Sequence, residues 1–284
     1  MNFIEICTLV MKISLVFFMA GNLMDMGLKL NLPDAIRGMR NVKFVIYTLL
    51  WGFVLGPAIA YGVAHIMPID KALGTGLILM GLAPCAPFVP LFVAKAKGDL
   101  GFTAAYMFLV AVGTIIIMPL AVPFMVEGLS VSAWAIAKPL IIMILIPLLI
   151  GMAIRGKSVT IADKMQPVVK KITMVFTLLV FVLLIVIYYK GIISVMGSLA
   201  IASQLIFFFI LTAFSYWFGF GLKHEEKIVL SIGNSTRNLG AAVAPLFAAT
   251  AIAPEAIIMV VLSLPVMVLF PPLAIKMFGK NAGK

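Results

Sequence analysis

Long apolar runs, separated by short polar connections, fill the sequence almost from end to end. Because about 20 consecutive apolar residues cross a bilayer as an α-helix, each run predicts one transmembrane helix. The predicted spans cover residues 3–28, 42–66, 70–95, 99–125, 133–154, 167–189, 193–221, 226–252 and 255–277. We therefore expect an all-α polytopic membrane protein with about nine transmembrane helices.

Composition and charge distribution favour a single membrane domain. Of the 284 residues, 64% are hydrophobic and 11% charged, which leaves no stretch for a soluble domain. The net charge of +11 arises because Lys and Arg gather in alternate connections, whereas the opposite connections hold only Lys71, Lys138 and Lys190. This asymmetry predicts an outside N-terminus and a cytoplasmic C-terminus in a bacterial-type inner or plasma membrane. It explains the basic excess without a nucleic-acid partner.

The predicted spans divide into two sets of four around one odd helix. Residues 3–125 form the first expected repeat, residues 133–154 a linker helix, and residues 167–277 the second repeat. One odd helix between them gives the two sets opposite orientations, as inverted-repeat transporters require. The third span of each set carries the unusual chemistry. We therefore expect one transporter domain over residues 1–284.

The span at 70–95 contains three prolines at three-residue spacing: Pro84, Pro87 and Pro90. Each proline removes a backbone donor and collides with the carbonyl four residues earlier. Broken backbone is not tolerated against lipid, so a break must be buried in protein or line a wet cavity. We expect a true interruption of the helix; a helix that is only kinked is the alternative.

The span at 226–252 has a polar run in its middle, made of Asn234, Ser235, Thr236, Arg237 and Asn238. We expect Gly233 to loosen the helix before this run and Gly240 to belong to a small-faced helix that restarts after it. A central arginine costs at least about 2.5–3.5 kcal/mol to insert, so Arg237 needs partners or water. It either caps carbonyls released by the broken helices or serves a substrate site, and the two roles are compatible.

Four segments carry motifs that extend along the chain. They are "FFMAGNLMDMGLKL" with a Gly-x-x-Met pattern, "GLAPCAPFVPLFVAKAKGD", "IIMPL" at 116–120, and "SIGNSTRNLGAAVA". In their order and spacing they resemble the bile acid/sodium symporter family, in which the second and fourth segments are usually written CxPGGxxSNxxxxxAxGD and ExGxQNxGLA. The second segment matches that pattern at Pro84, Ala96, Gly98 and Asp99.

The resemblance implies a core of two crossed, interrupted helices packed on a flatter panel domain. It also implies alternating access for an organic anion. Family members that use sodium bind it through a Ser-Asn pair, through hydroxyls of the next helix, and through a glutamate and a glutamine. The corresponding positions here are Val89 and Pro90, the apolar residues 107–111, Gly233 and Arg237, while the neighbouring Asn238 is retained.

The side-chain oxygens that a hard cation needs are therefore absent from this sequence. We hypothesise that Arg237 supplies, as a fixed guanidinium, the positive charge that bound sodium supplies in relatives. If both interrupted helices restart at the crossing, their N-terminal dipole ends also point inward and favour an anion. No metal ion and no other cofactor is expected.

Charged residues elsewhere offer no obvious coupling group. The acidic residues all fall at predicted span ends or in loops, at Glu5, Asp25, Asp34, Asp70, Asp99, Glu127, Asp163, Glu225, Glu226 and Glu255. No carboxylate is thus placed to relay protons at mid-membrane depth. Facilitated diffusion, exchange against a counter-substrate or substrate-proton cotransport fits better than sodium symport. Lys12 either snorkels to the outer interface or lines the substrate cavity.

The expected function is secondary active or facilitative transport of a small organic anion, a carboxylate, across a lipid bilayer. The expected substrate-binding residues are Arg237, Asn238, Asn234, Ser235 and Thr236, with Lys12 and Cys85 at the cavity. An enzyme is not expected, because the sequence presents no nucleophile–base pair and no metal cluster. The alternatives are a sodium-coupled symporter as in the family, an arsenite-type permease that uses Cys85, and a membrane sensor that does not transport.

Overall fold

The structure, a computed structural model, describes residues 2–30, 32–126, 131–249 and 254–279, and these fold into helices without a β-strand. In chain order they are α1 (Phe3–Lys29), α2 (Leu32–Met39), α3 (Val42–Leu50), η1 (Trp51–Leu55), α4 (Gly56–Ile66), α5 (Lys71–Gly81), α6 (Val89–Lys95), α7 (Leu100–Met125), α8 (Ala133–Leu140), η2 (Ile141–Leu145), α9 (Ile146–Lys157), α10 (Val159–Ser194), α11 (Ala200–Trp217), α12 (His224–Asn234), α13 (Leu239–Ala248) and α14 (Pro254–Phe278). The elements η1 and η2 are π-helical turns inside longer helices.

Within the described ranges, seven continuous helical stretches are long and apolar enough to cross a membrane. The stretch α3–η1–α4 is one of them and α8–η2–α9 is another. The prediction of an all-α polytopic membrane protein is confirmed. The two other predicted spans, 70–95 and 226–252, each contain two shorter helices with a break between them. The count of nine spans, the inverted repeat and the division into two repeats and a linker stay predictions.

Helix α10 is longer than the predicted span 167–189, since it begins at Val159 and ends at Ser194. Its first turns mix polar and apolar residues, and side chains of other helices bond to two of the polar ones. The Gln166 amide donates to Asp25 Oδ1 at 2.6 Å, and Arg155 Nη1 donates to Asp163 Oδ1 at 3.0 Å. Hydropathy locates the apolar part of a helix. It does not locate the residues at which the helical hydrogen bonding begins and ends.

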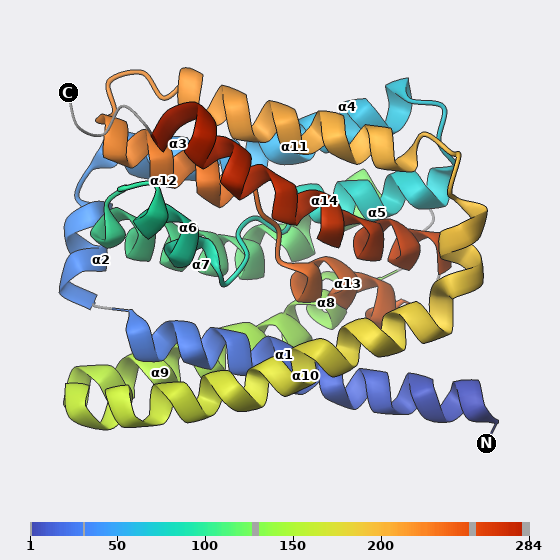
Figure 1. Cartoon of the computed structure of the whole chain (residues 1–284), viewed down its shortest axis with the longest axis horizontal. Coiled ribbons are helices and arrows are strands. Elements are labelled where there is room, and N and C mark those ends of the chain that lie inside the picture. Colours follow the sequence, from blue (N-terminus) through green and yellow to red (C-terminus); the bar gives the residue numbers. More distant parts are fainter. Residues whose placement is uncertain (1, 31, 127–130, 250–253, 280–284) are drawn as a thin grey trace.

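Helices α1, α9 and α10 lie side by side and form a layer along one side of the molecule (Figure 1). Glycines bring α1 and α9 close together, because a Cβ on Gly151 would come within 2.7 Å of the Met24 carbonyl oxygen. Arg155 also donates from Nη1 to the Leu28 carbonyl at 2.8 Å. We call this layer, with α8 and η2, the panel.

The remaining helices form the other side of the molecule, which we call the core (Figure 1). Helix α5 packs between α4 and α14, and α11 packs on α12 and α14. The approach of α5 to α14 is close because Gly76 has no Cβ, and one placed there would collide with the Ala256 carbonyl. Small residues therefore allow the helices of the core to surround the two interrupted spans.

Candidate functional site

The two helix breaks meet each other and pair through their backbones. Pro84 and Arg237 form an antiparallel bridge. The Cys85 N–H donates to the Thr236 carbonyl at 3.0 Å, and the Asn238 N–H donates to the Ala83 carbonyl at 2.9 Å. These bonds satisfy backbone groups that the breaks release, as a membrane interior requires. Interrupted helices are therefore observed at both predicted places.

The first break runs from Leu82 to Phe88, between α5 and α6, and contains Pro84 and Pro87. Cys85 between them has a φ of 72°, a left-handed conformation that residues other than glycine adopt rarely. Pro90 was expected at the break but lies in the first turn of α6. A proline is accepted there because the first amides of a helix have no intrahelical acceptor.

The second break is shorter, with α12 ending at Asn234 and α13 beginning at Leu239. Gly233 lies in the last turn of α12, and Gly240 lies in the first turn of α13, the helix that was expected to restart there, so neither stands in the break itself. Their lack of a side chain serves packing instead. A Cβ on Gly233 would collide with the Tyr106 ring, and a Cβ on Gly240 would come within 2.9 Å of Met19 Sδ.

Side chains of the polar run satisfy the end of α12 and the start of α13. Asn234 Nδ2 donates to the Leu230 carbonyl, Ser235 Oγ to that of Ile232, and Thr236 Oγ1 to that of Gly233. Thr236 Oγ1 also accepts the Ala86 amide of the other break at 3.0 Å. Asn238 caps α13, because its Oδ1 accepts the Ala241 amide. Three of the predicted substrate-binding residues, 234–236, are thus fully buried capping residues in this conformation.

Arg237 is fully buried at the crossing, on the side of the core. Its guanidinium carbon lies 5.3 Å from the centroid of the Phe207 ring of α11. Its Nη2 faces α4, since a Cβ on Gly56 would lie 3.3 Å from that nitrogen. Its backbone N–H donates to Met267 Sδ of α14 at 3.0 Å. Helices α4 and α11 thus contact the side chain, and α14 contacts the backbone of the same residue.

The guanidinium has no hydrogen-bond partner within the part of the chain that the structure describes: Nε, Nη1 and Nη2 are all unpaired. It therefore caps none of the carbonyls there. The buried carboxylate Glu226 lies in the first turn of α12, where it accepts the Lys223 amide and Asn41 Nδ2. Arg237 is thus a buried positive charge that the described carboxylates leave unpaired, in contact with an aromatic face.

Two further residues of the crossing were not predicted. Among the described residues the buried Tyr106 hydroxyl of α7 has no hydrogen-bond partner, and the ring lies against Gly233 near the end of α12. Phe207 supplies the ring under the guanidinium. Neither stands out in the sequence, because both are apolar or aromatic residues within apolar runs. The close approach of α4 to the crossing could have been predicted from the sequence. Gly52 and Gly56 are four residues apart, and this spacing allows close helix contact.

A pocket lies on the other side of the crossing, between core and panel, with a volume of about 320 Å³ that includes open solvent; we call it the crossing pocket. Its lining is Leu23, Met26, Pro84, Cys85, Ala86, Pro87, Met107, Val110, Ala111, Thr114, Ile144 and Asn238. Among its polar groups, Thr114 Oγ1 donates to the Val110 carbonyl. Asn238 is the other polar residue of the lining; its Oδ1 accepts the Ala241 amide, and its side chain also carries an amide donor, Nδ2.

The predicted site residues are therefore split between the two sides of the crossing. Asn238 and Cys85 line the crossing pocket, together with Pro84 and Pro87, whereas Arg237 is enclosed in the core. Lys12 is exposed on α1 and lines neither pocket described here. Over the described ranges, no group of three or more His, Cys, Asp or Glu side chains is gathered to hold a metal ion. Glu127 lies outside the described residues.

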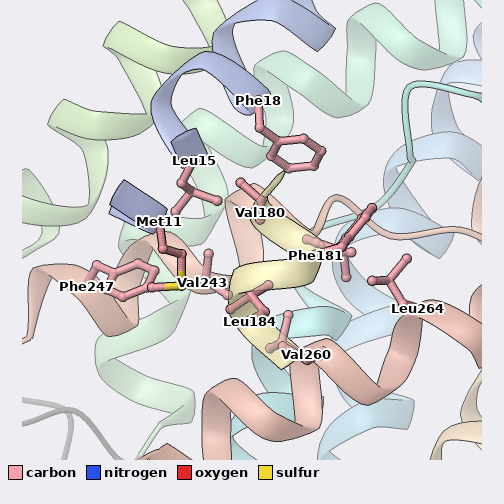
Figure 2. A pocket seen from close by; sticks show the side chains of 12 residues that line it. Met11, Leu15, Phe18, Val180, Phe181, Leu184, Val243, Phe247, Val260 and Leu264 are labelled. Atoms are coloured by element: carbon pink, nitrogen blue, oxygen red, sulfur yellow. The ribbon is translucent and has the colours of Figure 1, made fainter. Parts of the chain in front are cut away.

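A second pocket, with an empty volume of about 410 Å³, lies along the same boundary between core and panel. Figure 2 shows apolar side chains from α1, α10, α13 and α14 pointing toward one another around it. Its lining is Met11, Leu15, Phe18, Val180, Phe181, Leu184, Leu239, Val243, Phe247, Val260, Val261 and Leu264. We call it the apolar pocket.

Comparison with known proteins gives two matches. A sequence model described as the sodium bile acid symporter family matches residues 14–196. The chain is also 22% identical over 221 residues to a protein of Arabidopsis thaliana named "Probable sodium/metabolite cotransporter BASS3, chloroplastic". The match covers 77% of this chain and 51% of that protein, so the chain spans about half the length of this relative.

Proposed function

The chain belongs to the sodium bile acid symporter family, and from this premise we propose that it transports a small organic anion, a carboxylate, without coupling to sodium. Transport is secondary active or facilitative and proceeds by alternating access. The observation that carries the proposal is the buried guanidinium of Arg237 where the two broken helices cross, which the described residues leave without a hydrogen-bond partner.

An unpaired buried charge costs several kcal/mol, and charges at membrane depth usually serve transport or signalling. The residues on either side of Arg237 are hydrogen-bonded across the crossing through their backbones, and one of them, Asn238, lines the crossing pocket. The N-terminus of α13 begins at the same point and adds positive potential. In our proposal a carboxylate binds at Asn238, and Arg237 stabilises it through the field across the crossing.

The proposal that sodium is not the coupling ion rests on the residues at the corresponding positions. Val89 and Pro90 have no side-chain oxygen that could bind sodium. Gly233 has no side chain, and the Tyr106 ring occupies the space beside it. A cation placed beside the guanidinium would also be repelled by it. A proton or a counter-substrate is the partner that we propose instead.

Sodium-coupled transport is the second candidate, because the Arabidopsis relative is named a sodium/metabolite cotransporter. The relation of panel to core supports alternating access for either candidate. Both pockets lie between these two layers, so a relative movement of the layers changes both. We further propose two inverted repeats, residues 3–125 and 167–277, and an outside N-terminus with a cytoplasmic C-terminus.

Uptake into liposomes that contain the purified full chain tests the proposal. A panel of labelled mono- and dicarboxylates is offered with sodium inside and outside, with potassium in its place, and with imposed pH gradients. We expect uptake of at least one carboxylate at equal rates in sodium and potassium, and its loss in the variant Arg237→Gln. Arg40→Gln, which removes an exposed arginine, is the matched control.

Each rival predicts a different result of this experiment. A sodium symporter takes up substrate only with sodium present, which would overturn the proposed coupling. A membrane sensor binds a carboxylate without flux. An arsenite-type permease protects sensitive host cells from arsenite, and a carboxylate carrier gives no such protection. Unchanged uptake by Arg237→Gln would refute the role of the guanidinium.

A further inference from the structure

The two pockets follow one another along the boundary between panel and core, and Met19 lies between the residues of α1 that line them. Helix α1 lines the apolar pocket with Met11, Leu15 and Phe18, and the crossing pocket with Leu23 and Met26. Phe18 and Leu23 are five residues apart, which corresponds to about 7.5 Å along the helix. A single elongated ligand is long enough to reach from one pocket into the other.

The second interrupted span passes between the pockets at the same level. Asn238 lines the crossing pocket, and the next residue, Leu239, lines the apolar pocket. Gly240 follows, and the side chain of Met19 lies against it: a Cβ on Gly240 would be 2.9 Å from Met19 Sδ and 3.2 Å from its Cε. Only 2% of the Met19 surface is exposed. Met19 therefore lies buried between panel and core, between the stretches of α1 that line the two pockets, although it lines neither of them.

The two pockets follow one another along α1, and they differ in the chemistry of their linings. The crossing pocket offers an amide donor at Asn238 and lies beside the buried charge of Arg237. The apolar pocket is lined only by apolar side chains. A carboxylate held at Asn238 would direct its apolar part toward Met19 and, beyond it, toward Leu239 and Val243.

Methionine is suited to a movable divider. Its side chain is unbranched and flexible, and it adapts to irregular spaces. Gly240 provides the room that the side chain occupies, because any Cβ there would displace it. The contact also joins the two layers, since Met19 belongs to the panel and Gly240 to the core.

We propose that Met19 is a specificity-determining residue that sets the length of the anion accepted. With Met19 on Gly240, the carboxylate site holds anions with a short apolar part, and the apolar pocket is closed to them. Shortening the side chain joins the two pockets into one site for longer, amphipathic carboxylates. This inference rests on the proposed function, because it takes the crossing pocket as the place of the carboxylate.

The test compares the full chain with its Met19→Ala variant in liposomes, with straight-chain carboxylates from acetate to decanoate. We expect the ratio of octanoate to propionate uptake to rise about tenfold in Met19→Ala, the change that follows if one or two further methylenes become buried and each adds roughly a factor of four to affinity. Met11→Ala is the matched control. It shortens a methionine of the same helix in the wall of the apolar pocket and leaves the divider in place, so its ratio should stay unchanged.

A second measurement needs no transport. The chain has two cysteines, Cys7 and Cys85, and in Cys7→Ser the remaining thiol is that of the crossing pocket. We expect Met19→Ala to raise the rate at which N-ethylmaleimide modifies Cys85 several-fold, and decanoate to slow that reaction only in Met19→Ala. Met11→Ala should change neither rate.

The two measurements separate the possible failures. If the full chain takes up no carboxylate but Met19→Ala still exposes Cys85, the proposed function is wrong and the divider is supported. If Met19→Ala changes neither the dependence of uptake on carboxylate chain length nor the rate of Cys85 modification, Met19 is only a packing residue and the inference is overturned. A change of equal size in Met11→Ala would also overturn it, because any enlarged pocket would then give the same result.

Discussion

Pro84 and Arg237, which are 153 residues apart in the sequence, face each other in an antiparallel backbone bridge where two interrupted helices cross. The backbone of Arg237 is thereby tied to a wall of the crossing pocket, whereas its side chain extends into the core. This arrangement separates the charge from the pocket that it serves in our proposal. The predictions that follow concern this crossing.

Replacing Arg237 should weaken transport more than any other single change at the crossing. We expect Arg237→Gln to lower kcat/KM for the carboxylate about ten- to hundredfold, because an interaction with a charged group contributes about 1.5–3 kcal/mol. Arg237→Lys keeps the positive charge through which Arg237 acts in our proposal, and it should retain most of the rate. Initial uptake rates over a range of substrate concentrations check this, with Arg40→Gln expected to match the unchanged chain.

The same charge should reduce the stability of the substrate-free protein. An unpaired guanidinium in the core costs several kcal/mol, and apolar replacements of buried charges often stabilise by about 1–4 kcal/mol. We therefore expect Arg237→Met to unfold several degrees higher than the unchanged chain in detergent while its uptake is lost. A lower unfolding temperature would mean that Arg237 has a stabilising partner in the folded protein.

Sequence patterns predicted the helical membrane fold and both interruptions because their causes are local. Prolines at 84 and 87 cannot continue a helix, and the polar run around Arg237 cannot lie against lipid. The structure agrees with both. The packing role of Gly233 and Gly240 was not predicted, because it depends on neighbours that the local sequence does not show. Those neighbours, Tyr106 and Met19, are distant in the sequence.

The direction of the Arg237 side chain could not be predicted from the sequence, for the same reason. It depends on Phe207 of α11 and on the room beside Gly56, and both belong to helices that meet only in the folded core. The polar residues 234–236 were expected to face substrate, whereas they bond to carbonyls of their own helix. Local bonds of this kind compete for Asn, Ser and Thr wherever a helix ends.

Thr236 should contribute to stability through its bond across the crossing. Its hydroxyl accepts the Ala86 amide of the other break, so Thr236→Val keeps the shape and leaves that buried amide without a partner. We expect a loss of about 1–3 kcal/mol in the free energy of unfolding, measured by thermal unfolding in detergent. Thr177→Val is the control, because that hydroxyl bonds only to the Thr173 carbonyl of its own helix. Equal losses in the two variants would contradict a special role for the crossing.

Cys85 should be required for its backbone conformation and not for its thiol. At a φ of 72°, glycine is the residue that adopts the conformation without strain, and a β-branched residue is the least suited. We expect Cys85→Gly to fold and to retain carboxylate uptake, and Cys85→Val to lose about 1–3 kcal/mol of stability. Uptake and thermal unfolding of both variants decide between conformation and chemistry. If the thiol itself bound substrate, as in an arsenite-type permease, Cys85→Gly would fold normally and lose activity, and this result would also remove the carboxylate assignment of the pocket.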